Sequence, residues 1–307
     1  MMSFAIIIPT LNAIDELPTL FASITAQTNQ PRRIIIIDSS SNDGTVDVSR
    51  EFGPEVYIVA KSEFNHGGTR MKGVRIAFMD CDVAIFLTQD AILHDKTSLA
   101  QLLEVFEDEN TGSAYGRQLP HENAGPLETY ARLANYPEIS ARHTSADIPE
   151  IGFKTCFCSN SFSAFRIAPL QQVGGFPEDT IFGEDALAVG ELLLAGYAHC
   201  YVAKYTVRHS HAYTLQEEFR RYFDIGVMHA RNSQLIERFG SPSGAGTTYV
   251  LGELRYLAQH SLLSVPEAML RTFLKYIAYK IGRRESMLSV NWKRRLSMHK
   301  RYWTAES

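Results

Sequence analysis

Apolar and polar positions alternate in blocks along the first third of the chain. Short apolar runs are separated by segments in which apolar residues recur every three or four positions, as on one face of a helix. The runs cover residues 4–8, 33–37, 57–60 and 83–87. Strands that alternate with helices predict parallel pairing with right-handed crossovers. We therefore predict an α/β fold with a mostly parallel central sheet flanked by helices.

Polar residues gather where these predicted strands end. Thr10 and Asn12 follow the first run, Asp38 follows the second, and Asp90 follows the fourth. Ligands of open α/β sheets bind at the carboxyl ends of the strands, so this edge is the predicted site. A carboxylate such as Asp38 can accept the N3 proton of uracil or thymine. The alternative interpretation is that each Asp only closes a turn or caps the next helix.

Two common nucleotide-binding motifs are absent. The loop after the first strand lacks G-x-G-x-x-G, and the chain has no G-x-x-x-x-G-K-[ST], which argues against a dinucleotide dehydrogenase and a P-loop enzyme. A sugar nucleotidyltransferase should open with a glycine-rich basic loop, and residues 8–12 offer none. The predicted site is therefore not one in which glycines cradle a phosphate.

The composition and charge of the chain exclude further classes of protein. The chain has 307 residues, of which 45% are hydrophobic, enough for one large core or two modest ones. A net charge of −4 argues against general nucleic-acid binding, which needs a concentrated basic face. The four cysteines form no C-x-x-C pair, so neither zinc nor a disulfide framework is indicated. No signal-peptide pattern and no run of roughly 18 apolar residues is found, so we expect a cytoplasmic protein.

The C-terminal third differs in charge. Residues 271–307 hold ten basic and two acidic residues, or about +8, against about −12 for the rest of the chain. Residues 214–270 are predicted to be helical with a break near 240–244, and an amphipathic basic helix follows. Its apolar face would comprise Phe273, Leu274, Ile277, Ala278 and Ile281. Together with Tyr276, Tyr279, Trp292 and Trp303 it could dock on an anionic membrane. The alternative is packing on the catalytic domain or on a dimer partner.

Several motifs carry a family resemblance. Residues 6–12 and 36–45 resemble the opening of glycosyltransferase family 2, an inverting family with the GT-A fold. Residues 64–70 and the motif Thr88-Gln89-Asp90-Ala91 are similar to its bacterial rhamnosyltransferase branch. Met71 departs from the Asn expected after Arg70. The resemblance covers roughly residues 3–215.

The resemblance implies a catalytic base. Residues 173–177 and 182–185 are similar to the acceptor-side region, where the family places its catalytic Asp before an apolar helix. Inverting transfer needs one base opposite the leaving diphosphate, and the helix dipole would favour ionised Asp185. Glu184 would support it. The alternative is that both acids only cap the helix.

The resemblance also implies donor and metal sites. The expected donor-binding residues are Pro9, Thr10, Asn12, Asp38, Ser40, His66, Gly67, Arg70, Gln89 and Asp90. Arg70 would clamp the diphosphate, because its guanidinium fork suits phosphate oxygens. Asp90 would bind Mg²⁺ or Mn²⁺ together with donor phosphates and either His209 or His211. A surface role for both histidines is the alternative.

The predicted function is transfer of a sugar from a nucleotide-diphosphate donor, with dTDP-L-rhamnose favoured, to a glycan or lipid-linked glycan of a bacterial surface polysaccharide such as O-antigen. A UDP-hexose or UDP-N-acetylhexosamine donor is the alternative, and a non-catalytic membrane-associated scaffold is the alternative of another class. The predicted domains are residues 1–213, divided at 118/119 into donor and acceptor halves, and a helical extension over 214–307. Peripheral association with the cytoplasmic face of the inner membrane and a homodimer are further expectations.

Overall fold

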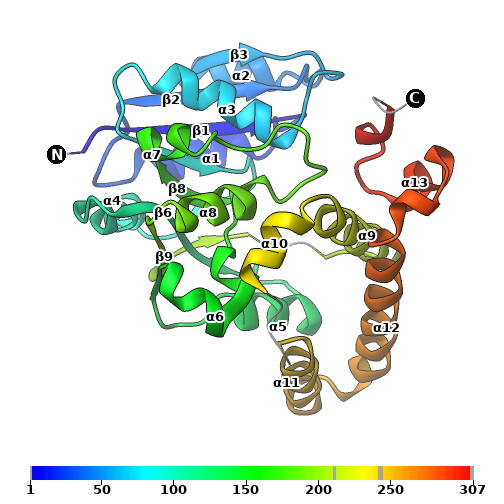
Figure 1. Cartoon of the computed structure of the whole chain (residues 1–307). Coiled ribbons are helices and arrows are strands. Elements are labelled where there is room, and N and C mark those ends of the chain that lie inside the picture. The colour runs from blue at the N-terminus through cyan, green and yellow to red at the C-terminus, as the bar shows by residue number, and fades with distance from the viewer. Residues whose placement is uncertain (1, 210–211, 241–244, 305–307) are drawn as a thin grey trace. The chain divides into compact units, whose positions relative to one another are not determined.

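The structure, a computed structural model, describes residues 2–209, 212–240 and 245–304 (Figure 1). The described residues form two compact units. The α/β unit contains the residues up to Leu119 together with 136–178 and 184–209. The helical unit contains residues 120–135, 179–183 and the described residues after 209. Residues 120–135 and 179–183 thus group with the C-terminal helices, whereas the predicted extension began at residue 214.

The α/β unit is built on a nine-stranded sheet within the described residues, in the order β3-β2-β1-β4-β8-β6-β9-β5, with β7 paired to β9. The strands are β1 (Phe4–Thr10), β2 (Arg33–Asp38), β3 (Glu55–Ile58), β4 (Val83–Leu87), β5 (Ile92–Leu93), β6 (Thr111–Leu119), β7 (Ala141–His143), β8 (Phe162–Arg166) and β9 (Ala198–Arg208). The four apolar runs of the N-terminal third therefore all form strands, although β3 lies two residues earlier than predicted.

The sheet is parallel in one half and mixed in the other. Strands β1, β2, β3 and β4 pair in parallel, as the alternation of strands and helices predicted. Strand β8 is antiparallel to both β4 and β6, and β5 and β7 are antiparallel to β9. The predicted α/β fold with helices flanking a central sheet is confirmed; in this second half the sheet is mixed, because among the described strands only β6 and β9 pair in parallel there.

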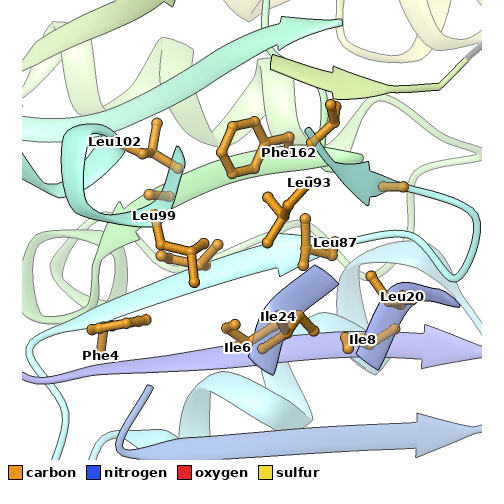
Figure 2. Close-up of a cluster of buried hydrophobic side chains, with 14 of the residues drawn as sticks. Phe4, Ile6, Ile8, Leu20, Ile24, Leu87, Leu93, Leu99, Leu102 and Phe162 are labelled. Carbon is orange, nitrogen blue, oxygen red and sulfur yellow. The ribbon is translucent and has the colours of Figure 1, made fainter. Parts of the chain in front are cut away.

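The strands are covered on both faces. The helices of the α/β unit are α1 (Leu17–Thr25), α2 (Thr45–Glu51), α3 (His66–Ala77), α4 (Ser98–Glu104), α6 (Ile148–Ile151), α7 (Ile167–Gln172) and α8 (Glu184–Leu194). Figure 2 shows side chains from β1, α1, β4, β5, α4 and β8 meeting in one buried cluster, among them Ile6, Ile24, Leu87, Leu93, Leu99 and Phe162. On β1, Ile7 points to the other face, where a Cβ added to Gly73 of α3 would lie 2.5 Å from it. This packing holds the carboxyl ends of β1, β2 and β4 at one edge.

The helical unit contains α5 (Pro126–Asn135), α9 (Leu215–Arg231), α10 (Ser233–Phe239), α11 (Ala245–His260), α12 (Val265–Gly282) and α13 (Val290–Leu296). Helices α9 and α12 pack closely through two glycines. A Cβ on Gly226 would lie 2.3 Å from the carbonyl oxygen of Tyr279, and one on Gly282 would lie 2.1 Å from that of Phe223. The predicted break overlaps residues 241–244, which lie outside the described residues.

The structure corrects the predicted amphipathic helix. The five apolar residues lie on one side of α12, but Ala278 is buried while Phe273 is exposed, so this side is partly covered within the protein. Arg271 and Lys275 both pair with Glu218, at 2.8 and 2.7 Å, and part of the basic charge is therefore neutralised internally. Trp303 is fully buried and is not available to a membrane. The helical periodicity was correct. However, the spacing of apolar residues alone could not show which apolar residues of α12 are buried and which are exposed.

Among the helices of the described residues, none is both long and apolar enough to cross a membrane.

Candidate active site

The ends of β1 and β2 are joined by the carboxylate of Asp38. Its side chain is fully buried. Thr10 Oγ1 donates to Asp38 Oδ2 at 2.8 Å, and Ser41 donates to the same carboxylate from both its backbone N–H (2.8 Å) and its hydroxyl (2.6 Å). A carboxylate offers about four acceptor sites, so capacity for a further donor remains. In this structure the hydrogen bonds of Asp38 hold together the loops after β1 and β2. Its contact with a nucleotide base stays a prediction.

Two loop residues adopt left-handed backbone conformations. Asn12 has φ 49° and Ser40 has φ 57°, and within the described residues these are the non-glycine positions with positive φ. Asn12 accepts a hydrogen bond from the Asn42 N–H through Oδ1, and the Ser40 hydroxyl donates to the Val59 carbonyl. Such conformations are costly and cluster at functional sites. They indicate that the two loops are held in a defined shape, and their place in the donor site stays a prediction. Pro9 lies in β1, just before them.

In the triplet Thr88-Gln89-Asp90 after β4, Gln89 and Asp90 contact different partners. Gln89 Oε1 accepts from the Leu11 N–H at 3.0 Å, and Gln89 Nε2 donates to the Leu11 carbonyl at 3.4 Å. An amide can do both, whereas an ionised carboxylate can only accept. Gln89 therefore ties the β4 loop to the β1 loop, which gives a physical reason for an amide at this position. The acid of the triplet, Asp90, is left to face a different partner.

That partner is His209. Its Nε2 lies 3.5 Å from Asp90 Oδ2, and the His209 side chain is almost completely buried. His209 Nδ1 lies 3.0 Å from Gln118 Oε1, while Gln118 Nε2 donates to Ser159 Oγ at 2.8 Å. An amide oxygen can only accept, so the proton of a neutral His209 is held on Nδ1. Nε2 then presents a lone pair toward Asp90. The other candidate, His211, lies outside the described residues.

The end of β9 brings His209 to this place. Strands β6 and β9 are parallel, but their register shifts: Gly116 pairs with Val202 and the next residue, Arg117, pairs with Thr206. The additional residues in β9 form an irregularity that redirects the strand, as bulges near functional sites commonly do. Beyond it, the His209 N–H donates to the Leu119 carbonyl. Local periodicity contains no signal for this shift.

The start of α3 is joined to the start of α8. Arg70 Nη1 lies 3.0 Å from Glu184 Oε1 and also donates to the His66 carbonyl at 3.1 Å. Both Arg70 and Glu184 are buried. Gly67 is required here by packing, because a Cβ would lie 2.0 Å from the Pro177 carbonyl oxygen. Arg70 is thus engaged by a carboxylate of its own chain, and its predicted role as diphosphate clamp stays untested.

Burial raises the pKa of Asp185, and the negative charge of neighbouring Glu184 raises it further. The carboxylate is held at the first turn of α8, with Oδ1 accepting from the Ala186 N–H (2.8 Å) and Oδ2 from the Asn160 N–H (3.1 Å). For Glu184, burial opposes ionisation, but the charge of Arg70 outweighs it, and the pKa is lowered. Asp185 is therefore the acid of the two that is suited to accept a proton, since a raised pKa makes it the stronger base.

The turn before β8 links these two parts of the site. Asn160 donates from its backbone to Asp185 and from Nδ2 to Glu184 Oε1 at 2.9 Å. The next residue, Ser161, has its hydroxyl 3.4 Å from His209 Nε2. Neither residue was predicted. A polar Ser-Asn-Ser run directly before an apolar strand was the available signal, but such a run is equally typical of an ordinary turn.

The structure thus brings the predicted residues together in three connected groups. Thr10, Asn12, Asp38 and Ser40 shape the loops after β1 and β2, Asp90 faces His209, and His66, Gly67 and Arg70 lie at the start of α3, against Glu184 and its neighbours. All of them belong to the α/β unit. The assigned roles of these residues stay predictions, whereas their association at one edge of the sheet is observed.

Comparison with known proteins decides the family. The model of glycosyl transferase family 2 matches residues 5–174, more than half of the chain. The chain belongs to glycosyl transferase family 2. This confirms the predicted family, and with it that the protein is a glycosyltransferase. The match covers the strands β1 to β4 and the turn that contains Asn160.

Two relatives of this family 2 transferase match it over nearly its whole length. The O-antigen chain rhamnosyltransferase WbaN of Salmonella anatum is 42% identical over 99% of this chain and 96% of its own length. The O-antigen chain rhamnosyltransferase RfbN of Salmonella typhimurium is 41% identical over 98% of this chain and 96% of its own. The predicted resemblance to the rhamnosyltransferase branch is therefore confirmed.

Solved structures confirm the fold of this family 2 transferase. The mannosyltransferase PcManGT from Pyrobaculum calidifontis, in complex with GDP-Man and Mn²⁺, has a TM-score of 0.60 at 16% identity and covers 99% of this chain and 86% of its own. S. aureus TarS 1-349 in complex with UDP-GlcNAc has a TM-score of 0.54 at 16% identity, with coverages of 93% and 92%. At these identities the likeness shows the shared GT-A architecture alone.

Proposed function

We propose that this family 2 transferase moves L-rhamnose from dTDP-L-rhamnose to a growing O-antigen chain, with inversion at the anomeric carbon. The observation that carries the proposal is the 42% identity, over nearly both full lengths, to a protein named O-antigen chain rhamnosyltransferase. The geometry of the site supports it, because a held base and a separate pair of facing ligands are present in one unit. A single displacement needs the base, and a cation held by the ligand pair would neutralise the leaving diphosphate.

Asp185 is the proposed base. As the acceptor hydroxyl oxygen bonds to the anomeric carbon, the bond from that carbon to the diphosphate oxygen breaks, and the diphosphate leaves with the electron pair. The acceptor proton passes to the Asp185 carboxylate. Hydrogen bonds from Asn160 and Ala186 hold this carboxylate in one orientation, so little reorganisation is needed during the reaction.

Glu184 and Arg70 are proposed to support the base rather than to react. The ion pair at 3.0 Å fixes the start of α3 against the first turn of α8. The negative charge of Glu184 also raises the pKa of Asp185, second only to burial. Burial and the charge of Glu184 together outweigh the opposing effect of Arg70, so Asp185 stays a strong base in a buried site.

The residues present fit a divalent cation. Asp90 Oδ2 and His209 Nε2 are two facing acceptors 3.5 Å apart, and the proton on His209 Nδ1 is directed to Gln118, as in many metal-binding histidines. Within the residues that the structure describes, no group of three or more His, Cys, Asp or Glu could hold a metal. Two protein ligands are sufficient for Mg²⁺ or Mn²⁺ when phosphate oxygens complete the shell. A bound cation would neutralise the charge of the leaving diphosphate.

Thr88, which directly precedes Gln89 and Asp90 in the sequence, has a buried polar atom. Thr88 Oγ1 is buried and has no hydrogen-bond partner in the structure. Such an atom costs free energy unless a ligand or water satisfies it. We propose that the donor side of the site extends to Thr88, next to the loops held by Gln89 and Asp38.

The test is a donor panel with the purified full chain, Mg²⁺ or Mn²⁺, and a lipid-linked O-antigen acceptor. dTDP-rhamnose is expected to be consumed with formation of an inverted product, and UDP-glucose, UDP-GlcNAc and GDP-mannose are not. Turnover with a UDP-sugar alone would reject the rhamnose donor but keep the enzyme class. Donor binding without turnover on any acceptor would instead favour a non-catalytic scaffold.

A further inference from the structure

Helix α12 has two opposite faces, and only one of them is used within the protein. Ala268, Ala278 and Gly282 are buried, and Gly282 meets α9. The opposite side carries several exposed apolar residues. They begin in the short 3-10 turn Leu262–Ser264 that precedes the helix. We define the apolar ridge as Leu262, Leu263, Met269, Leu270, Phe273 and Tyr276.

The ridge is unusually exposed for side chains of this kind. Its members are between 47% and 94% accessible, with Leu263 the most exposed of them. Along α12 they recur at intervals of three and four residues, so they lie on one side of the helix. Single exposed apolar residues need no explanation, but a contiguous strip of them marks an interaction surface.

The same side of α12 ends in cations. Lys280 follows Phe273 and Tyr276 at helical spacing, and Arg284 lies two residues beyond the end of α12; both are exposed. Lys280 Nζ lies 5.5 Å from the centre of the Tyr276 ring. Neither cation makes an ion pair within the part of the chain that the structure describes. They differ from Arg271 and Lys275, whose charges Glu218 neutralises on the packed side of the helix.

These observations favour one occupant of the ridge. A helix with leucine and aromatic residues on one side, ending in unpaired cations, matches the interfacial helices that lie in the surface of a bilayer. Anionic lipid head groups carry the negative charge that can pair with Lys280 and Arg284. A second copy of the same side would bring exposed apolar residues, but no carboxylate to pair with these cations.

We infer that the apolar ridge docks the helical unit on the surface of an anionic lipid bilayer, with Lys280 and Arg284 at the head groups. The inference rests on the proposed function for its purpose, because a lipid-linked acceptor is presented at such a surface. It differs from the sequence-based expectation in the residues involved: Ala278 and Trp303 face inward, whereas Leu263, Met269 and Leu270 face outward.

The experiment is vesicle flotation of the full chain without sugar donor or acceptor. Binding is expected to vesicles containing phosphatidylglycerol and to be weaker with phosphatidylcholine alone or at high salt. The double substitution Leu263→Ser/Phe273→Ser should lower the partition coefficient by about tenfold per side chain. Lys280→Gln/Arg284→Gln should lower it by about fivefold per charge, and only on anionic vesicles.

Matched controls come from the α/β unit. Met79→Ser removes an exposed apolar side chain and Lys96→Gln removes an exposed cation, and both should float like the unaltered chain. The inference is overturned if the unaltered chain does not float, or if the ridge variants float as well as it does. It is also overturned if the ridge variants lose only self-association in analytical ultracentrifugation, which would assign the ridge to a second copy. Because no sugar is present, a negative flotation result would not count against rhamnosyl transfer. A negative transfer assay would likewise not count against binding to the vesicles.

Discussion

The two acidic centres of the site are built in opposite ways. Asp90 is partly exposed and faces His209, whose Nδ1 lies 3.0 Å from the Gln118 amide oxygen. Glu184 is buried against Arg70, and this ion pair lies within the fold. One centre therefore places a carboxylate opposite an imidazole ring, and the other places a carboxylate against a guanidinium group.

This difference indicates how the two centres divide the chemistry. Two facing acceptors are stable together only with a proton or a cation between them, so the Asp90 centre is suited to recruit a metal with the donor. At the second centre, Arg70 keeps Glu184 ionised, and the resulting negative charge keeps Asp185 basic. Under the proposed mechanism, the first centre is completed by the substrate, whereas the second is completed by folding.

The largest expected effect concerns the base. Asp185→Asn preserves the shape and the contact with Asn160 but cannot take a proton, so kcat should fall by about 10³-fold or more. Donor binding, measured by isothermal titration with dTDP-rhamnose, should be unchanged. The exposed Asp95→Asn serves as control and should retain full activity. Near-normal turnover by Asp185→Asn would remove the distinction between the two centres.

The next effect concerns stability. Arg70→Met leaves Glu184 buried without its cation and should lower the free energy of unfolding by about 3 kcal/mol, measured by urea denaturation. Arg75→Met, on the same helix, breaks the exposed pair with Glu178 and should cost less than about 1 kcal/mol. Equal effects of the two substitutions would show that the Arg70 pair is not completed by folding.

A third effect concerns metal dependence. Asp90→Asn should lower kcat/KM by about 100-fold and weaken the response to added Mn²⁺, because one of the two proposed ligands loses its charge. Gln118→Leu removes the partner of His209 Nδ1 and should weaken Mn²⁺ affinity by about tenfold or more. If Asp90→Asn kept full metal-dependent turnover, Asp90 would not be a metal ligand.

The smallest effect is a shift in pH dependence. Asp185 acts as a base only when ionised, so kcat/KM should fall as pH decreases through its pKa, which lies above the ~4 of an ordinary Asp. Glu184→Gln removes the charge that raises this pKa and should move the acid limb down by about one pH unit. Glu178→Gln, which alters an exposed acid, should leave the limb in place. An upward movement would contradict the assigned coupling.

The parts that could be predicted from sequence depend on local patterns. Four apolar runs became β1 to β4, and most apolar residues of β1, β2 and β4 are buried whereas those of the edge strand β3 are partly exposed. The place of Asp90 and Asp38 followed from the rule that sites lie at the carboxyl ends of strands. The antiparallel β8 could not be predicted this way, since its partners are distant in sequence and its own residues allow either direction.

The site shows the same division between local and distant information. A helix start at Asp185 and the chemistry of an acid there were visible from the residues around it, and the motif of residues 88–91 pointed to the branch. The pairing of Arg70 with Glu184 could not be predicted from the sequence, because a guanidinium group binds phosphate and carboxylate equally well. Asn160 and Ser161 were missed because their importance comes only from what packs against them.

The sequence by itself determined the four strands β1 to β4, the family and the acids that can take part in the reaction, because apolar periodicity and short motifs are properties of neighbouring residues. Only the tertiary structure decided which acid faces His209, which one is neutralised by Arg70, and which side of α12 remains exposed. Pairing, burial and the resulting pKa of Asp185 depend on groups brought together from distant parts of the chain. Folding sets their distances and the local dielectric, and these quantities govern electrostatic energies.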